Sequence, residues 1–341
     1  MKNLYRSVFF PLVLFVTALS VALSVTLSVT CCSAFAGEKT VGIAVSKRIR
    51  PYVEVLDGIV KGLGQKSPTG VSLKPDVVFL PEAGSLEELK KRLAEEAYDV
   101  LVAVGPEAGE LVWSMEGFGD LAASNHPPGF YPRKRIYSAV LNPEKMMVRA
   151  ANNRGGALPN HETPQGCGIS LKIPVASQVE TIAETFPDLE RIGILFDPRY
   201  NQLFFETAAA SAARKQVKIL PLAVDSKKEI PKVLDENWHK IDCVWLIPDP
   251  TVISEKIVQY VIKQALYNNL GVVGYNPFFT RSGAFFSFAF DYGKIGLQTA
   301  QQVISWLEKG VCASPPPLFQ RQINTGMVKK LGIRPKGEER P

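Results

Sequence analysis

Short apolar runs alternate with amphipathic helical patterns along the second half of the chain. From Arg191 to Lys309 the runs have the length of strands, and the segments between them repeat apolar residues at helical spacing. Strands that alternate with helices indicate a parallel sheet, because each helix returns the chain to the same end of the sheet. Such a sheet binds ligands at the carboxyl ends of its strands. The pattern therefore predicts an α/β fold with a ligand crevice.

The same order occurs in both halves of the chain. The predicted strands of the first half are 40–45, 71–80, 99–104 and 136–141. Those of the second half are 191–196, 217–221, 241–247 and 271–275. With 341 residues and 46% apolar composition, the chain has enough material for two hydrophobic cores. We therefore expect two doubly wound, parallel-sheet lobes.

The first 36 residues differ from the rest. Lys2 and Arg6 precede an uncharged stretch from Val8 to Gly37 that contains Ala34-Phe35-Ala36 near its end. A basic start, an apolar middle and small residues before a cut are typical of a cleaved signal peptide. We expect residues 1–36 to be removed and the mature chain to be periplasmic. The stretch is also long enough to span a bilayer, so retention as a membrane anchor stays open.

Charge and cysteine content exclude several classes of protein. Loss of Lys2 and Arg6 lowers the formal charge from +6 to +4, which is too small and too evenly spread to favour nucleic acid as a partner. The mature chain keeps Cys167, Cys243 and Cys312, an odd number without a C-x-x-C motif. Neither a disulfide framework nor a zinc site is indicated.

Motifs of common catalytic and cofactor sites are missing from the sequence. His126, His161 and His239 are far apart, and there is no G-x-S-x-G or Walker sequence. Gly62-Leu-Gly64 lies at the end of a predicted helix, where a dinucleotide-binding loop is not expected. The sequence therefore predicts no enzyme activity, no cofactor and no metal.

Polar residues and turn-forming glycines follow several predicted strands. They are Gly105, Glu107, Asn142, Asp197, Asn201, Asp249, Thr251, Tyr275 and Asn276. The turn at Gly105-Pro106-Glu107 is expected to present free backbone N–H groups to an anionic group of a ligand. Each residue alone is also typical of a helix cap or a turn. Together they are predicted to line one crevice.

Aromatic residues are concentrated around the segment from Gly283 to Phe290. Phe286, Phe288 and Phe290 share one face at strand period. Two interpretations stay open, a buried strand between the lobes and a pocket wall that stacks on a flat ligand.

Four groups of residues resemble one known family. They are 191–198 with Asn201; Gly283-Ala284 with Ser287 and Asp291-Tyr292-x-x-x-Gly296; Ile323-Asn324 with 329–333; and Gly168-Ile169-Ser170 with Pro174, Val175 and Gln178. These segments resemble the periplasmic substrate-binding proteins of ABC transporters, in the family that includes tryptophan and tyrosine binders. The resemblance covers nearly the whole mature chain and is strongest after Gly166.

The resemblance implies the type I periplasmic binding-protein fold, in which three crossings join two lobes that close on a ligand. It implies residues 37–145 plus 283–310 for the N-terminal lobe and 146–282 plus 311–341 for the C-terminal lobe. Closure needs only a few linking residues to change their dihedral angles. Asp291 lies at one of these crossings.

The chain departs from the family at positions that bear on the ligand. Ser170-Leu171 stands where the family often has Ser-Asp, and 275–279 replaces an acidic stretch. A carboxylate that could pair with an amino group is therefore missing. Amino-acid-like and aromatic or apolar ligands both stay open.

We therefore expect a non-catalytic monomer that binds a small organic ligand and delivers it to ABC permease subunits. The predicted ligand-binding residues are Gly105, Glu107, Asn142, Ser170, Asp197, Asn201, Asp249, Thr251, Tyr275, Asn276, Phe286, Phe288 and Asp291. The same fold also serves as the ligand-sensing component of signalling systems, and this alternative stays open.

Overall fold

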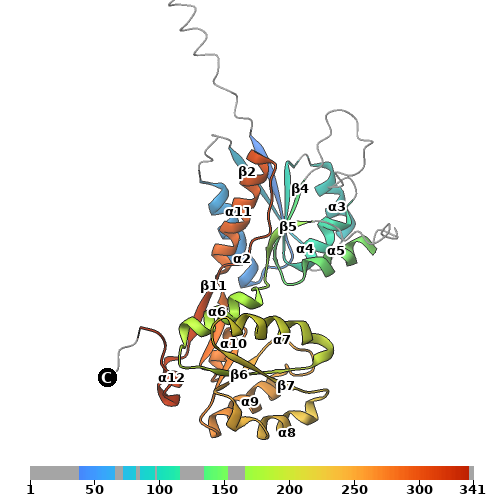
Figure 1. The fold of residues 1–341 in the computed structure, drawn as a ribbon. Helices are drawn as coiled ribbons and strands as arrows, with labels where there is room; N and C mark the ends of the chain where they lie inside the picture. Colours follow the sequence, from blue (N-terminus) through green and yellow to red (C-terminus); the bar gives the residue numbers. More distant parts are fainter. Residues whose placement is uncertain are drawn as a thin grey trace, which may run out of the picture.

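Two α/β lobes lie one above the other in the computed structural model (Figure 1). The structure describes residues 38–65, 72–81, 85–96, 98–115, 134–152 and 166–337. The predicted signal peptide, 1–36, lies outside the described residues. Within those ranges no helix is both long and apolar enough to cross a membrane.

The first sheet has the strand order β2-β1-β3-β4-β5, and its strands pair in parallel. Its strands are β1 (Lys39–Val45), β2 (Leu73–Phe79), β3 (Val100–Val104), β4 (Lys134–Val140) and β5 (Cys167–Ser170). Every residue of β3 is buried, which explains its continuous run of apolar residues. The sheet is therefore covered on both faces.

Helices cover the two faces of the first sheet (Figure 1). They are α2 (Arg50–Leu63), α3 (Leu86–Glu95), α4 (Pro106–Ser114), α5 (Pro143–Asn152) and α11 (Tyr292–Lys309). Helices α2 and α11 pack so closely that a Cβ at Gly58 would lie 2.2 Å from the Gly293 carbonyl oxygen. A Cβ at Gly296 would lie 2.1 Å from the Val55 carbonyl oxygen. Glycine at both contacts brings the two backbones together.

The second sheet has the order β11-β10-β9-β8-β6-β7, and β11 alone among these strands pairs antiparallel. Its strands are β6 (Arg191–Phe196), β7 (Lys218–Ala223), β8 (Cys243–Leu246), β9 (Gly271–Gly274), β10 (Phe286–Phe290) and β11 (Phe319–Ile323). The α-helices of this lobe are α6 (Val175–Thr185), α7 (Pro198–Ala213), α8 (Ile230–Asp235), α9 (Glu255–Tyr267), α10 (Pro277–Arg281) and α12 (Thr325–Leu331).

Two strands belong to sheets other than those that the predicted domain boundaries imply. β5 pairs with β4 of the first sheet, although 146–282 was assigned to the second lobe. β10 pairs with β9 and β11 of the second sheet, although 283–310 was assigned to the first. The chain therefore crosses to the other lobe after β5 and again after β10. Of the predicted segment 283–310, only α11 returns to the first lobe.

The carboxyl ends of the parallel strands in each sheet face the other lobe. β5 runs parallel to β4, and from its end the chain passes through residues 171–174 into α6 of the second lobe. β10 runs parallel to β9, and from its end the chain passes through Asp291 into α11 of the first lobe. Since both crossings leave from a carboxyl edge, the two carboxyl edges lie opposite each other (Figure 1).

A disulfide joins Cys167 in β5 to Cys312 after α11, with the two Cα atoms 5.9 Å apart. The expectation that no disulfide framework exists is therefore wrong for this pair. The two cysteines are 145 residues apart in sequence, and the return of α11 to the first lobe brings them together. Cys243 is buried in β8 and is not bonded. The disulfide fastens the third crossing, residues 310–318, to the first sheet.

Candidate ligand-binding site

The candidate site consists of the loops that follow the strands at the two facing edges. We call residues 46–50, 105–107 and 141–142 the first rim. We call residues 197–203, 224–225, 248–251 and 275–276 the second rim. Most of the predicted ligand-binding residues lie on these two rims, because they follow parallel strands.

Two buried carboxylates join the strand ends of the second rim. Asp197 and Asp249 are 0% and 2% exposed. Oδ2 of Asp249 accepts hydrogen bonds from the Asp197 backbone N–H at 2.9 Å and from Asn201 Nδ2 at 2.8 Å. Its Oδ1 accepts from the backbone N–H groups of Thr251 and Val252, at 2.8 and 3.0 Å. The hydroxyl of Thr251 donates to Asp197 Oδ2 at 2.6 Å. The network therefore fixes the end of β6 against the loop after β8.

Arg199 forms an ion pair with Asp197 two residues before it. Its Nε donates to Oδ1 and Oδ2 at 2.9 and 3.1 Å, and its Nη2 donates to Oδ2 and to the Asp225 carbonyl oxygen. The guanidinium hydrogen bonds hold the pKa of Asp197 well below its usual range, although burial opposes this shift. The Arg199 side chain is 60% exposed. The second rim therefore presents a guanidinium to solvent in front of a buried carboxylate.

The turn at Gly105 brings the first rim close to β1. Its φ of 88° is in the region that favours glycine, and a Cβ there would lie 2.6 Å from Ser46 Oγ. Its N–H donates to the Ser138 carbonyl oxygen, and the Ala108 N–H donates to Ser46 Oγ, both at 2.9 Å. Pro106 has no N–H. The prediction that this turn presents free N–H groups to an anion is therefore wrong for these residues.

Glu107 forms an ion pair with Lys47 across the first rim, with Nζ 2.8 Å from Oε1. Burial by itself raises the pKa of Glu107, but the Lys47 hydrogen bond and the residue's own backbone N–H bring that pKa below its ordinary value. Its Oε2 is buried without a hydrogen-bond partner. The Glu107 carboxylate is therefore already paired with Lys47 when a ligand reaches the first rim.

The other predicted polar residues of the rims and crossings are spread around the two edges. Asn142 is exposed directly before α5. Ser170 ends β5, and its Oγ accepts the Lys172 backbone N–H at 3.3 Å. Asn276 caps α10, and the ring of Tyr275 lies 4.7 Å from that of Phe279. Ser170 and Asn276 therefore do act in a turn and a helix cap, as the sequence also allowed. These roles hold their side chains at the facing edges.

Asp291 lies where the second crossing enters α11. Its Oδ1 caps the helix by accepting the Lys294 N–H at 3.1 Å, and its Oδ2 accepts from Gln320 Nε2 at 2.6 Å. Lys294 Nζ is 3.1 Å from the same carboxylate. Asp291 therefore connects the second crossing to β11, beside the third crossing.

Phe286 and Phe288 do not line an open surface. They are 0% and 1% exposed, and their rings pack edge to face 5.1 Å apart. Phe186 and Phe319 pack against them in the core of the second lobe. Of the two interpretations of the aromatic segment, the structure gives the buried strand.

Sequence reasoning missed several exposed residues of the rims. Arg199 was absent from the predicted set, as were four large apolar side chains that are exposed: Ile49, Leu141, Tyr200 and Leu203. A signal was present in the sequence, since Tyr200 and Leu203 directly follow the predicted strand 191–196, where ligand-binding residues are expected.

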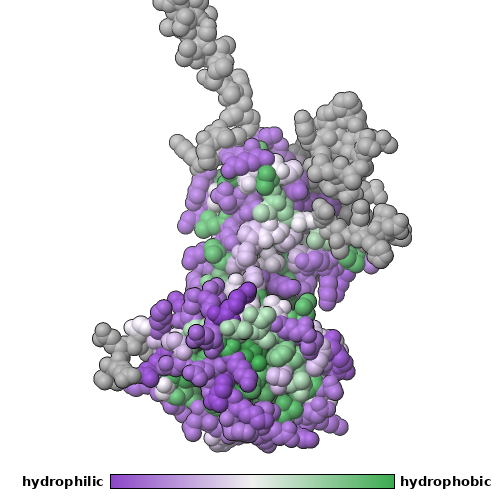
Figure 2. Space-filling model, in the orientation of Figure 1, coloured by the Kyte–Doolittle hydropathy of each residue, from purple (hydrophilic) through white to green (hydrophobic). Residues whose placement is uncertain are grey.

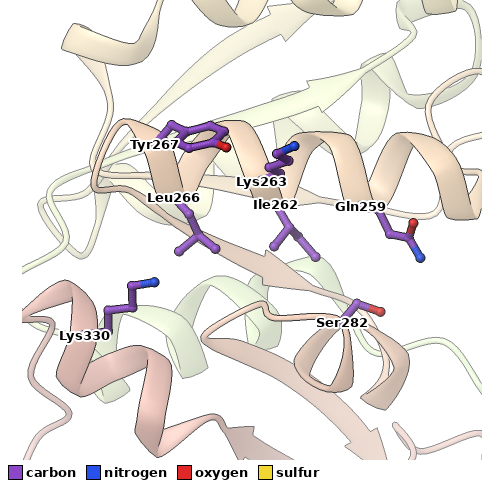
Figure 3. Close-up of a pocket in the computed structure, with 7 residues that line it drawn as sticks. All are labelled: Gln259, Ile262, Lys263, Leu266, Tyr267, Ser282 and Lys330. Carbon is purple, nitrogen blue, oxygen red and sulfur yellow. The ribbon is translucent and has the colours of Figure 1, made fainter.

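A surface groove of about 370 Å³ lies elsewhere, between α9 and α12 (Figure 3). It is lined by Gln259, Ile262, Lys263, Leu266, Tyr267, Ser282 and Lys330. The end of α9 leads into the amino end of β9, so the groove lies at the edge of the sheet opposite the second rim. It contains none of the predicted site residues. In the part of the chain that the structure describes, no group of His, Cys, Asp and Glu side chains is placed to hold a metal ion.

A family model described as ABC transporter substrate binding protein matches residues 158–336, which is more than half of the 341 residues. No curated protein sequence matches the chain.

Several solved structures have a similar architecture. A substrate-binding protein with adhesive properties from Clostridium difficile, in its ligand-free, open form, is 17% identical, with a TM-score of 0.63 over 89% of this chain and 96% of that chain. A Streptococcus pneumonia protein, described as an ABC domain in complex with L-Trp, is 18% identical, with a TM-score of 0.46 over 87% and 95%. A conserved domain protein from Vibrio cholerae is 19% identical, with a TM-score of 0.47 over 88% and 97%. The first of these likenesses, together with the two parallel sheets, confirms the predicted type I fold.

Proposed function

Because this chain belongs to the family of ABC transporter substrate-binding proteins, we propose that it binds a small organic solute between its two rims and delivers it to an ABC importer. The observation that carries the proposal is that the carboxyl edges of two parallel sheets face each other across three crossings. Ligands of parallel α/β sheets bind at such edges. Closure about the crossings then needs changes in a few linking residues.

The predicted site residues that lie at the facing edges and crossings divide into three roles. The proposed ligand contacts are Gly105, Glu107, Asn142, Ser170, Thr251, Tyr275 and Asn276, which lie at the facing edges; among them, Thr251 also belongs to the network of the two buried carboxylates. Asp197, Asn201 and Asp249 act as positioning residues, since their side chains hold one another and the backbone. Asp291 acts at the hinge, because it bonds to β11 beside the third crossing.

We further propose that the mature chain is a non-catalytic monomer in the periplasm. Its lobes follow the predicted boundaries, except that β5 belongs to the first lobe and β10 to the second. The Cys167–Cys312 disulfide supports an exported location, because such bonds persist in oxidising compartments.

A thermal-shift screen of the mature chain, residues 37–341, tests the binding role. The probes are the amino acids, aromatic acids and nucleobases. A ligand present at a hundred times its Kd stabilises the native state by about 2.7 kcal/mol, so a true ligand raises the Tm measurably. A screen without any hit would contradict the proposal.

A second measurement separates delivery from sensing. Uptake of the identified ligand is compared in cells with and without the gene for this protein. Loss of uptake in the deleted strain is the expected result. Unchanged uptake with altered gene expression would replace the importer role by the sensing role.

A further inference from the structure

The acidic groups of the second rim are occupied by the protein itself. Both oxygens of Asp197 accept hydrogen bonds from Arg199, and Oδ2 also accepts from Thr251. Both oxygens of Asp249 accept two hydrogen bonds each. A carboxylate has about four lone-pair sites for hydrogen bonds. A cationic group of a ligand would therefore have to displace an internal donor from either acid.

Two other acidic groups near the first rim also have partners. Glu107 is paired with Lys47. Asp225 differs, because its backbone carbonyl accepts from Arg199 while its exposed carboxylate makes only a small contribution to the raised pKa of Arg199, which comes first from Asp197. On α2, directly after the first rim, Glu54 lies 2.7 Å from Arg50 Nε. With the exception of Asp225, the acids at and beside the rims are therefore already paired within the protein.

Apolar side chains are exposed on both rims. Leu203 is 77% exposed and Tyr200 59% on the second rim, and Leu141 is 55% and Ile49 45% on the first. Figure 2 shows an apolar area on the second lobe, below the junction, and mixed apolar and polar surface where the two lobes meet. Burial of large apolar side chains by a bound ligand contributes favourably to the free energy of binding. The surfaces that face each other are therefore suited to an apolar body.

Arg199 connects these two observations. It forms an ion pair with the buried Asp197 carboxylate. It is followed directly by Tyr200, which with Leu203 forms the exposed apolar pair. Arg48 on the first rim lies over the Phe79 ring, 3.8 Å from its centre, and adds a cationic group to this rim. The combination disfavours ligand amines and tolerates ligand acids.

We propose that the site selects small molecules with an apolar body and no cationic group, and that Arg199 determines this specificity by keeping the Asp197 carboxylate occupied. This inference rests on the proposed solute-binding function and names the class of solute.

The test compares matched pairs of compounds that differ in one ammonium group. The probes are L-phenylalanine against 3-phenylpropanoate and L-leucine against 4-methylpentanoate, titrated calorimetrically into the mature chain. The wild type is expected to bind the acid of each pair at least about tenfold more tightly than the amino acid, because one unfavourable charge contact is sufficient for that ratio. Arg199→Met should narrow this ratio at least about tenfold by exposing the Asp197 carboxylate. Arg199→Lys keeps a cation and should retain the wild-type ratio.

Two further variants test the apolar contact. Leu203→Ser should weaken binding of both members of a pair by a similar factor. The matched control is Tyr267→Ser, a 70% exposed residue on the opposite edge of the lobe, which should change neither affinity. If Arg199→Met does not fold, the wild-type ratio and the Leu203 variant still decide the proposal.

The outcomes separate this inference from the proposed function. Amino acids that bind the wild type as tightly as their paired acids would overturn the inference and leave solute binding intact. An unchanged ratio in folded Arg199→Met would remove Arg199 from the explanation. Absence of binding by these probes, with a cationic solute as the hit of the wider screen, would overturn the inference alone, and a wider screen without hits would overturn both.

Discussion

The two lobes fix their facing rims by different means. The second rim is held by buried carboxylates that accept hydrogen bonds from backbone and side chains of two neighbouring strand ends. The first rim carries an exposed ion pair, and its lobe is secured by a disulfide and by close backbone packing of α2 on α11. The comparison indicates that substitutions of rim acids affect stability in the second lobe far more than in the first.

Asp249→Ala is the change with the largest expected effect. It leaves the buried N–H groups of Asp197 and Val252 without an acceptor, and each such loss costs about 1–3 kcal/mol. We expect a total loss of about 4 kcal/mol in urea unfolding of the mature chain. A loss no larger than that of Glu107→Ala, the matched acid of the first rim, would remove the difference between the two rims.

Removal of the disulfide should act on the first lobe. Cys167→Ser with Cys312→Ser is expected to cost about 3 kcal/mol, because the bond restricts a long loop of the unfolded chain. Amide hydrogen exchange should show the loss of protection in β5 and α11. Equal loss in the second sheet would indicate that the lobes unfold as one unit.

The Asp197–Arg199 pair should make the second lobe sensitive to acid. The folded-state pKa of Asp197 is depressed, so its contribution is fully present above the unfolded value of about 3.9 and declines as the pH falls below that value. Arg199→Met should therefore be less stable than the wild type at pH 7, with a difference that shrinks below about pH 4. Thermal denaturation between pH 7 and pH 3 measures both curves, and parallel curves would contradict the assignment.

Glu107→Gln is the change with the smallest expected effect on stability. Its partner Lys47 is exposed to solvent, which screens such pairs. We expect a Tm close to that of the wild type. The substitution should change the salt dependence of ligand affinity more than it changes the Tm. A loss comparable to that of Asp249→Ala would show that the first rim is as strongly coupled as the second.

Regular elements and their caps were largely predictable from the sequence. The predicted strand 191–196 coincides with β6. Ser85-Leu-Glu-Glu88 has the spacing of a capping box, and Ser85 Oγ accepts the Glu88 N–H. Glycine is typical of the position that follows a helix, and α11 ends at Gly310 with that glycine in the left-handed region. These features depend on a few neighbouring residues, and local patterns therefore carry enough information.

Features that depend on distant parts of the chain were not predictable. The membership of β5 and β10 in their sheets follows from which strand each one pairs with, and periodicity does not encode a partner. The same holds for the Cys167–Cys312 bond. Ser177 and Glu180 fit the spacing of a capping box, but α6 begins earlier, after Pro174. At the site, the expectation that polar residues follow the ends of parallel strands located Asp197 and Asp249. It did not locate Arg199, which forms an ion pair with Asp197.

The placement of α11 has a consequence for the order in which the protein matures. This helix completes the hydrophobic core of the first lobe against α2, yet it follows the strands β6 to β10 of the second sheet in the chain. During vectorial synthesis, amino terminus first, nearly all of the second lobe emerges before the first lobe can bury the apolar face of α2. Most of the second lobe is therefore expected to begin folding before the core of the amino-terminal lobe can be completed.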